Sequence, residues 1–84
     1  MKLVKYQSEW CQSCKTQTSL LNTIDLGDIV LEQIDIDNLD VQQLSKVKVH
    51  SLPTLILYDN QGNEIKRKSG TLTKKQLEDF LCLD

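Results

Sequence analysis

Residues 3–15 read Leu-Val-Lys-Tyr-Gln-Ser-Glu-Trp-Cys-Gln-Ser-Cys-Lys, so two cysteines separated by two residues follow a short run of strand-forming side chains. We expect a strand over residues 3–7 and a helix from about Cys11 to Ile24. Residues 29–36 again contain β-branched and other apolar residues over a strand-like length, which predicts a second strand. Strand, helix and strand in succession form a βαβ unit, whose two strands are parallel and joined by a right-handed crossover.

Two shorter signals mark helix boundaries farther along the chain. Gly27 is expected to end the first helix, because glycine readily takes the left-handed conformation found at helix C-termini. Asp40 and Gln43 have the spacing of a capping box, which predicts a short helix to about Lys46.

The second half of the chain predicts a β-hairpin. Residues 52–58 are the strongest strand pattern in the sequence, with Pro53 tolerated near its start. Residues 59–63 predict a turn, and residues 64–69 predict the antiparallel partner strand. Gly70 then ends the pairing.

The last predicted element is a helix that begins at a second capping box. Thr73 is its N-cap, and Gln76 lies three residues later. Three apolar side chains at helical spacing predict one buried face: Leu77, Phe80 and Leu81.

Composition limits what the chain can do. Its 84 residues are 39% hydrophobic, which suffices for a single domain over residues 1–84. A net charge of −2 gives no basic field for a phosphate backbone, so we expect no nucleic-acid partner.

No apolar run could cross a bilayer, and residues 1–10 lack the apolar region of a signal peptide, so we expect no membrane association. Three cysteines leave one unpaired in any disulfide scheme, which favours a reducing compartment, and we expect a cytoplasmic location.

The pair Cys11 and Cys14 predicts thiol–disulfide chemistry. At the start of a helix the two residues share nearly one face, with Cα atoms about 5–6 Å apart, which is within the range of a disulfide. Cys11 meets the unpaired N–H groups and the positive end of the helix, which stabilise a thiolate. We therefore expect Cys11 to attack a substrate disulfide and Cys14 to resolve the mixed disulfide.

A zinc or iron site is the alternative for a Cys-x-x-Cys motif. The remaining soft or borderline ligands, Cys82 and His50, form no second paired motif, so we expect no metal. Cys82 is expected to be a bystander thiol off the core face of the last helix, with regulatory oxidation or an intermolecular disulfide as the alternative. His50 is expected to be a loop residue, which could adjust the pH response only if it lies near Cys11.

The pattern Glu-Trp-Cys-x-x-Cys-Lys over residues 9–15, together with the Leu-Pro-Thr turn at residues 52–54, resembles the thioredoxin family over essentially the whole chain. The resemblance implies an α/β fold, in which a four-stranded mixed sheet in the order 2-1-3-4 carries three helices distributed over both faces. It also implies a protein-disulfide reductase that binds no cofactor. Its electrons would come from a thioredoxin-reductase-like flavoprotein. A monomer is expected for so small a fold.

The resemblance also implies a substrate site. The Leu52–Pro53 bond would be cis and would place Pro53 against the cysteines, while the backbone of Leu52 pairs with an extended substrate segment. Trp10 and Gly70 match family positions that border the substrate groove. A packing tryptophan and a turn glycine are the alternatives.

Three positions depart from the family pattern. Gln12-Ser13 replaces the usual Gly-Pro between the cysteines, which leaves the reduction potential and the direction of exchange open. Lys5 aligns with the family's buried acidic residue. Its ammonium could favour thiolates, its neutral amine could accept a proton, or the side chain could reach solvent and tune nothing. Gln33 aligns with a family lysine near the site, so that charge is absent here.

Two other functions stay open. A glutaredoxin-like enzyme recharged by glutathione fits the small size, although residues 58–62 lack the Gly-Gly turn of that family. The second is a non-catalytic interaction module of the same fold, whose thiols are structural or hold a metal.

Overall fold

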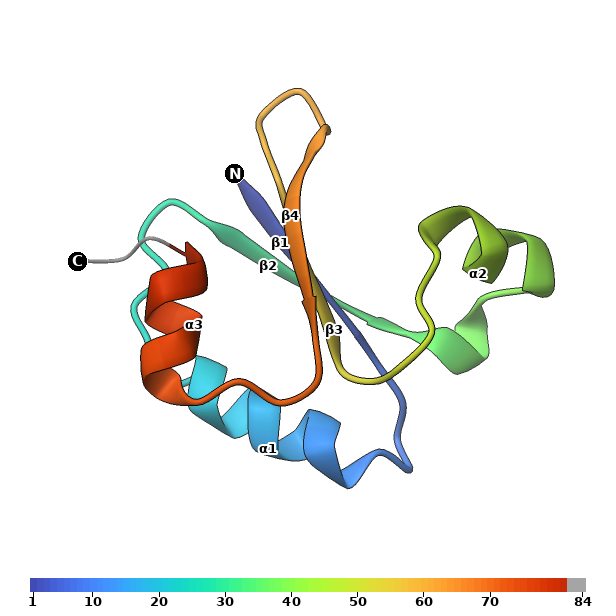
Figure 1. The fold of residues 1–84 in the computed structure, drawn as a ribbon, viewed down its shortest axis with the longest axis horizontal. Helices are drawn as coiled ribbons and strands as arrows, with labels where there is room; N and C mark the ends of the chain where they lie inside the picture. Colours follow the sequence, from blue (N-terminus) through green and yellow to red (C-terminus); the bar gives the residue numbers. More distant parts are fainter. Residues whose placement is uncertain (82–84) are drawn as a thin grey trace.

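The chain folds into strands and helices that alternate through its first half and end in a hairpin and a helix. The computed structural model describes residues 1–81. The elements run in the order β1 (Lys2–Gln7), α1 (Gln12–Leu21), β2 (Val30–Asp35), η1 (Ile36–Asn38), α2 (Val41–Val47), β3 (Thr54–Tyr58), β4 (Glu64–Ser69) and α3 (Lys74–Leu81), as drawn in Figure 1.

The four strands form one mixed sheet in the order β2-β1-β3-β4, as predicted. β1 is parallel to β2, whereas β1 with β3 and β3 with β4 are antiparallel. The central strands carry side chains buried on both faces, including Lys5 of β1, whose register partners are Gln33 of β2 and Leu55 of β3. The β1–α1–β2 crossover therefore delivers the two cysteines to one end of the central strand.

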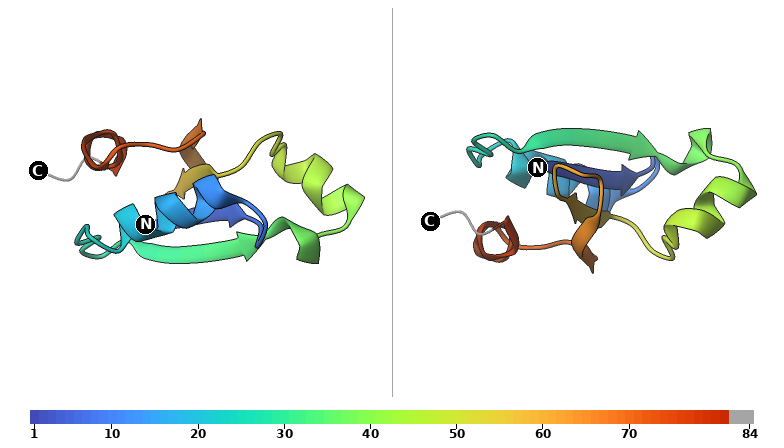
Figure 2. Two further views of the ribbon diagram at one scale, coloured as in Figure 1. Left: turned by 90° about the horizontal axis from the view of Figure 1, so that it is seen from below. Right: turned by 90° about the horizontal axis from the view of Figure 1, so that it is seen from above.

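Helices cover both faces of the sheet. α1 and α3 lie side by side, and α2 lies apart from them beyond the end of β2 (Figures 1 and 2). The cluster on the α1 and α3 face consists of Leu3, Leu21, Leu55, Leu57, Leu72, Leu77 and Leu81. The smaller cluster on the other face consists of Val4, Tyr6 and Ile56, with Leu39 and Val47 among the half-buried side chains around it. Alternate residues of β1 and β3 thus serve opposite cores.

Both predicted capping boxes are confirmed. The Asp40 Oδ1 atom accepts from the Gln43 N–H at 2.8 Å, and Gln43 Oε1 accepts from the Asp40 N–H at 2.9 Å. At α3 the Gln76 N–H donates to Thr73 Oγ1 at 3.2 Å, and the Thr73 N–H donates to Gln76 Oε1 at 2.9 Å. Each pair satisfies backbone donors that a helix N-terminus leaves unpaired.

The predicted end of the first helix was wrong, because α1 stops at Leu21 and not near Ile24. Its C-cap is Asn22, with φ −67°, and Gly27, with φ 59°, lies in the turn that follows. A physical reason lies in the hydroxyls of this segment. The side chain of Thr23 donates to the Leu20 carbonyl at 2.7 Å and so competes with continued helical pairing.

The predicted start of the third strand was also wrong, since β3 begins at Thr54 and not at Leu52. The Leu52–Pro53 peptide bond is cis, and Thr54 Oγ1 donates to the Ser51 carbonyl at 2.6 Å. The residues before Thr54 therefore form a tight turn instead of extended backbone. No helix within residues 1–81 is long and apolar enough to span a bilayer.

Candidate active site

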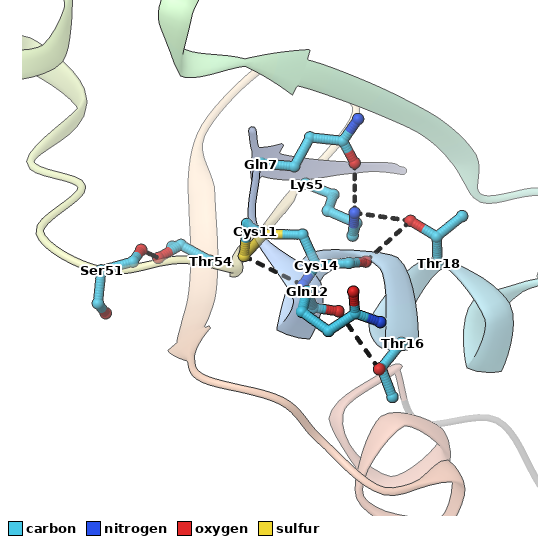
Figure 3. The surroundings of a disulfide bond; sticks show 9 residues. All are labelled: Lys5, Gln7, Cys11, Gln12, Cys14, Thr16, Thr18, Ser51 and Thr54. Atoms are coloured by element: carbon cyan, nitrogen blue, oxygen red, sulfur yellow. Dashed lines mark hydrogen bonds between the residues drawn. A yellow bond between two sulfur atoms is a disulfide. The ribbon is translucent and has the colours of Figure 1, made fainter. Parts of the chain in front are cut away.

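The two cysteines lie where β1 gives way to α1 (Figure 3). A turn closed by the Cys11 N–H and the Ser8 carbonyl, 3.2 Å apart, brings Cys11 to the N-cap position of α1. Cys14 follows within the first turn of the helix. Their Cα atoms are 5.2 Å apart, and the two sulfurs form a disulfide.

The two sulfurs have different surroundings. Cys11 Sγ accepts the Cys14 N–H at 3.1 Å, which is the N-cap interaction that normally uses an oxygen. The first turn of α1 contains no acidic residue that would oppose a negative charge there. Cys14 is 2% exposed, against 8% for Cys11. A thiolate at Cys11 is therefore stabilised by the helix N-terminus, while Cys14 lies deeper.

A shallow groove of about 320 Å³ opens beside Cys11. Its lining comes from the Cys-x-x-Cys loop, η1, α2 and the turn before β3: Trp10, Cys11, Ile36, Leu44, Val49, His50, Ser51 and Leu52. Trp10 is 71% exposed, so it is not a packing tryptophan of the core. The structure thus brings Trp10, Leu52 and Cys11 together, and it adds His50.

The other two predicted groove residues are joined to each other. Pro53 is buried, and its carbonyl accepts the Gly70 N–H at 2.9 Å. Gly70 has φ 88°, a left-handed conformation that favours glycine. This bond links the end of β4 to the turn that carries Leu52, so Gly70 acts on the groove through Pro53.

Lys5 lies beneath the cysteines and is fully buried. Of the three alternatives for Lys5, a side chain that reaches solvent is therefore excluded. Its Nζ atom donates to Gln7 Oε1 and to Thr18 Oγ1, the latter at 2.8 Å (Figure 3). Burial lowers the pKa of the Lys5 ammonium to about 8. A titratable cation therefore occupies the interior next to the disulfide, while Gln33, its partner on β2, supplies no charge.

Comparison with known proteins identifies this arrangement. A family model described as Thioredoxin matches residues 1–82. The chain belongs to the thioredoxin family. Thioredoxin of Chlamydia trachomatis is 32% identical over 77 residues, which cover 89% of this chain and 74% of that protein. Thioredoxin of Buchnera aphidicola is 32% identical over 84 residues, which cover 96% of this chain and 75% of that protein.

Solved structures agree with the family assignment. Thioredoxin-2 of a malaria parasite superposes with a TM-score of 0.82 at 25% identity, covering 99% of this chain and 82% of that one. A thioredoxin-family fold with a Cys-x-x-Cys pair at disulfide distance performs thiol–disulfide exchange. The chain is accordingly a thiol–disulfide oxidoreductase that acts on disulfide-containing proteins.

Sequence reasoning missed two polar side chains of this thioredoxin site. Gln7 and Thr18 accept hydrogen bonds from Lys5, and Thr18 Oγ1 also donates to the Cys14 carbonyl at 3.1 Å. The spacing of both residues in the sequence could have indicated their positions. Gln7 lies two residues after Lys5 on the same face of a strand, and Thr18 lies four residues after Cys14 on the same face of a helix.

The structure offers no set of ligands for the zinc or iron site considered above, within the part of the chain that it describes. Among residues 1–81, no three His, Cys, Asp or Glu side chains gather as a metal site would require. His50 is exposed at the groove beside Cys11. Cys82, expected to be a bystander thiol, lies outside the described residues.

Proposed function

We propose that this thioredoxin-family protein reduces protein disulfides, with Cys11 as the attacking thiolate and Cys14 as the resolving thiol. The Cys11 thiolate attacks one sulfur of the substrate disulfide, and the other substrate sulfur leaves with the electron pair. Cys14 then loses its proton and attacks Cys11 Sγ, which releases the second substrate sulfur as a thiolate and closes the Cys11–Cys14 bond. Two electrons pass from the protein to the substrate.

The observation that carries this assignment is the hydrogen bond from the Cys14 N–H to Cys11 Sγ at the N-terminus of α1. The same N–H would donate to the Cys11 thiolate, and a donor to the charged form lowers the pKa of a thiol. The sulfur beside the groove is thus the one best suited to attack.

The groove supports an extended protein substrate. Trp10 and Leu52 line it together with Cys11, and the hydrogen bond between Pro53 and Gly70 holds the Leu52 turn in place. A substrate strand that pairs with the Leu52 backbone would need few specific side-chain contacts, which suits a reductase of several proteins.

The electron source and the setting are part of the proposal. The protein binds no cofactor, receives electrons from a thioredoxin-reductase-like flavoprotein, and works as a monomer in the cytoplasm. The unpaired third cysteine favours a reducing compartment. Sedimentation under reducing conditions tests the monomer, and turnover with NADPH and a thioredoxin reductase tests the electron source.

The first experiment is the equilibrium reduction potential of the Cys11–Cys14 pair in glutathione buffers, with Cys11→Ser as the control. A value near −270 mV, typical of thioredoxin, supports a general reductase. A value about −200 to −230 mV, with turnover by glutathione instead of the flavoprotein, supports the glutaredoxin-like alternative. The absence of any two-electron couple would overturn the enzymatic function and leave the interaction module.

A further inference from the structure

A buried cation lies under the resolving cysteine. The Lys5 side chain has no exposed surface, and its Nζ atom reaches Thr18 Oγ1 at 2.8 Å. That hydroxyl donates in turn to the Cys14 carbonyl at 3.1 Å. Lys5, Thr18 and Cys14 therefore form one connected unit between β1 and α1 (Figure 3).

The surroundings leave the charge of Lys5 largely uncompensated. Both side-chain acceptors of its ammonium, Gln7 and Thr18, are neutral oxygens. Its strand neighbours, Gln33 on β2 and Leu55 on β3, are also neutral. The charged residues that line the pocket next to Cys14 are Glu9 from the preceding loop and Lys15 from α1, both solvent-exposed and therefore screened. A negative charge on Cys14, whose carbonyl is joined to Lys5 through the Thr18 hydroxyl, would compensate the buried ammonium.

We propose that the Lys5 ammonium stabilises the thiolate of Cys14 and thereby promotes the resolving step. This inference rests on the proposed role of Cys14 as the resolving thiol. In that step the Cys14 proton leaves to solvent, its sulfur bonds to Cys11 Sγ, and the substrate sulfur departs with the electron pair. Lys5 is a positioning residue, since it changes the charge state of Cys14 without touching the substrate.

A pocket gives the proton a route out. It measures about 280 Å³ and is lined by Gln7, Ser8, Thr18 and Cys14 among others. The Ser8 hydroxyl is buried there and has no hydrogen-bond partner within residues 1–81. A water in this pocket, held by the Ser8 hydroxyl and the polar side chains of Gln7 and Thr18, would accept the Cys14 proton.

The charged form of Lys5, the ammonium, is the form that stabilises the Cys14 thiolate. Burial lowers its pKa to about 8, so at neutral pH most molecules still carry the ammonium. A thiolate at Cys14 would raise that pKa again, because each charge favours the other. The neutral amine, a proton acceptor, is therefore the minor species during the reaction.

The test titrates Cys14 as the sole thiol, in a Cys11→Ser, Cys82→Ser background, by the ultraviolet absorbance of the thiolate. Lys5→Met should raise the pKa of Cys14 by about one, which is a tenfold loss of thiolate near neutral pH. Lys5→Arg should restore most of the thiolate. Lys2→Met, which removes an exposed lysine of the same strand, is the matched control and should change nothing. Titration curves of Lys5→Met and Lys2→Met that coincide would overturn the proposal.

A second measurement keeps Lys5 in place, in case its replacement prevents folding. By linkage, a Cys14 thiolate must raise the pKa of Lys5 as much as Lys5 lowers that of Cys14. In the same background, NMR titration of the Lys5 side chain should show a lower pKa after Cys14→Ala. An unchanged pKa contradicts the coupling.

Failure of this inference differs from failure of the proposed function. Without coupling, the unaltered protein still shows a reversible two-electron couple and Cys11-dependent exchange. Without that couple, the reductase proposal fails whatever the titrations show. Where both hold, Lys5→Met should also make the reduction potential more negative at pH values above the pKa of Cys14, by up to about 30 mV for a tenfold change in the equilibrium constant, since the thiolate of the reduced form is then less stable.

Discussion

The surface beside Cys11 and the interior beneath Cys14 differ in polarity and in access to water. Beside Cys11 lies an open groove with largely apolar lining, in which Trp10 is 71% exposed. Beneath Cys14 lies the buried side chain of Lys5, and Gln17, three residues farther along α1, is buried against the Leu72 backbone. The two cysteines are only one helical turn apart, yet one faces the substrate and the other faces a polar interior.

This difference shows that one motif can stabilise two thiolates by two means. The helix N-terminus serves Cys11 through a backbone N–H at 3.1 Å. That donor is used at the first step, when Cys11 attacks. Cys14 needs its charge at the second step, and the nearby cation is a side chain on β1. Substitutions on the two sides should therefore affect different steps.

The largest expected effect is on turnover, and it differs between replacement of Cys11 and replacement of Cys14. Cys11→Ser should reduce turnover of a disulfide-containing protein by about a thousandfold or more, because the attacking sulfur is lost. Cys14→Ser should attack at a rate within a few-fold of the unaltered protein and then accumulate a mixed disulfide with the substrate. Intact-mass spectrometry of rapidly quenched reactions distinguishes them. A mixed disulfide that accumulates in Cys11→Ser instead would reverse the assigned roles.

The next effect concerns the stability of the oxidised protein and its pH dependence. The pKa of Lys5 is about 8 in the folded protein, against 10.5 ordinarily, so the unfolded chain binds more protons between these values. The free energy of unfolding contributed by this group therefore rises with pH from about 8 to 10.5, and the full cost of burying the ammonium is present below pH 8. Lys5→Met should stabilise the oxidised protein by up to roughly 3 kcal/mol at pH 7.

Urea unfolding at several pH values measures this effect. The gain from Lys5→Met should shrink as the pH rises through 8, because the unaltered protein then buries a neutral amine. Lys2→Met again serves as the control, since Lys2 is exposed. A stability difference that does not vary with pH would show that the ammonium carries no burial cost.

Local patterns predicted most of the fold. The capping boxes at Asp40 and Thr73 rely on residues three apart, and the hairpin from β3 to β4 relies on a turn of a few residues. The strand order 2-1-3-4 came from the resemblance that the Cys11 motif carries. Such signals lie within short stretches of sequence, where periodicity and turn chemistry act directly.

What the sequence could not predict depends on contacts between distant segments. The side chain of Gln17 pairs with the backbone of Leu72, 55 residues away, and Arg67 reaches carbonyls on α2. Lys5 was an ambiguous case, because a long amphipathic side chain either reaches solvent or remains buried, depending on neighbours such as Thr18. No local pattern specifies which partner a buried polar group finds.

A smaller effect is expected from Gln17, on the interior side. Its Oε1 atom accepts the Leu72 N–H at 2.7 Å, and its Nε2 atom donates to the Leu72 carbonyl at 3.3 Å. Gln17→Ala leaves both backbone groups buried without these partners and should cost about 2 kcal/mol of unfolding free energy. Thr16→Ala, at an exposed position of the same helix, should change it by less than about 0.5 kcal/mol. Equal costs for the two variants would show that water replaces the amide.

The smallest expected effect lies on the groove side, at Arg67. Its Nη1 atom donates to the carbonyls of Val47 at 2.9 Å and Lys48 at 3.1 Å, at the end of α2, just before the loop that supplies Val49 and His50 to the groove. Arg67→Met should loosen this loop and raise KM for a protein substrate by about fivefold, equivalent to ~1 kcal/mol, with kcat nearly unchanged.

Lys68→Met, at the next position of β4 and exposed, is the control for the loss of positive charge. Hydrogen exchange should be faster in α2 of Arg67→Met but not of Lys68→Met, because the Arg67 side chain donates to the carbonyls at the end of this helix. If KM rises equally in both variants, long-range charge attracts the substrate and the shape of the groove does not depend on Arg67. If kcat falls while KM stays constant, the effect of Arg67 extends to the cysteines, and the two sides of the site are not independent.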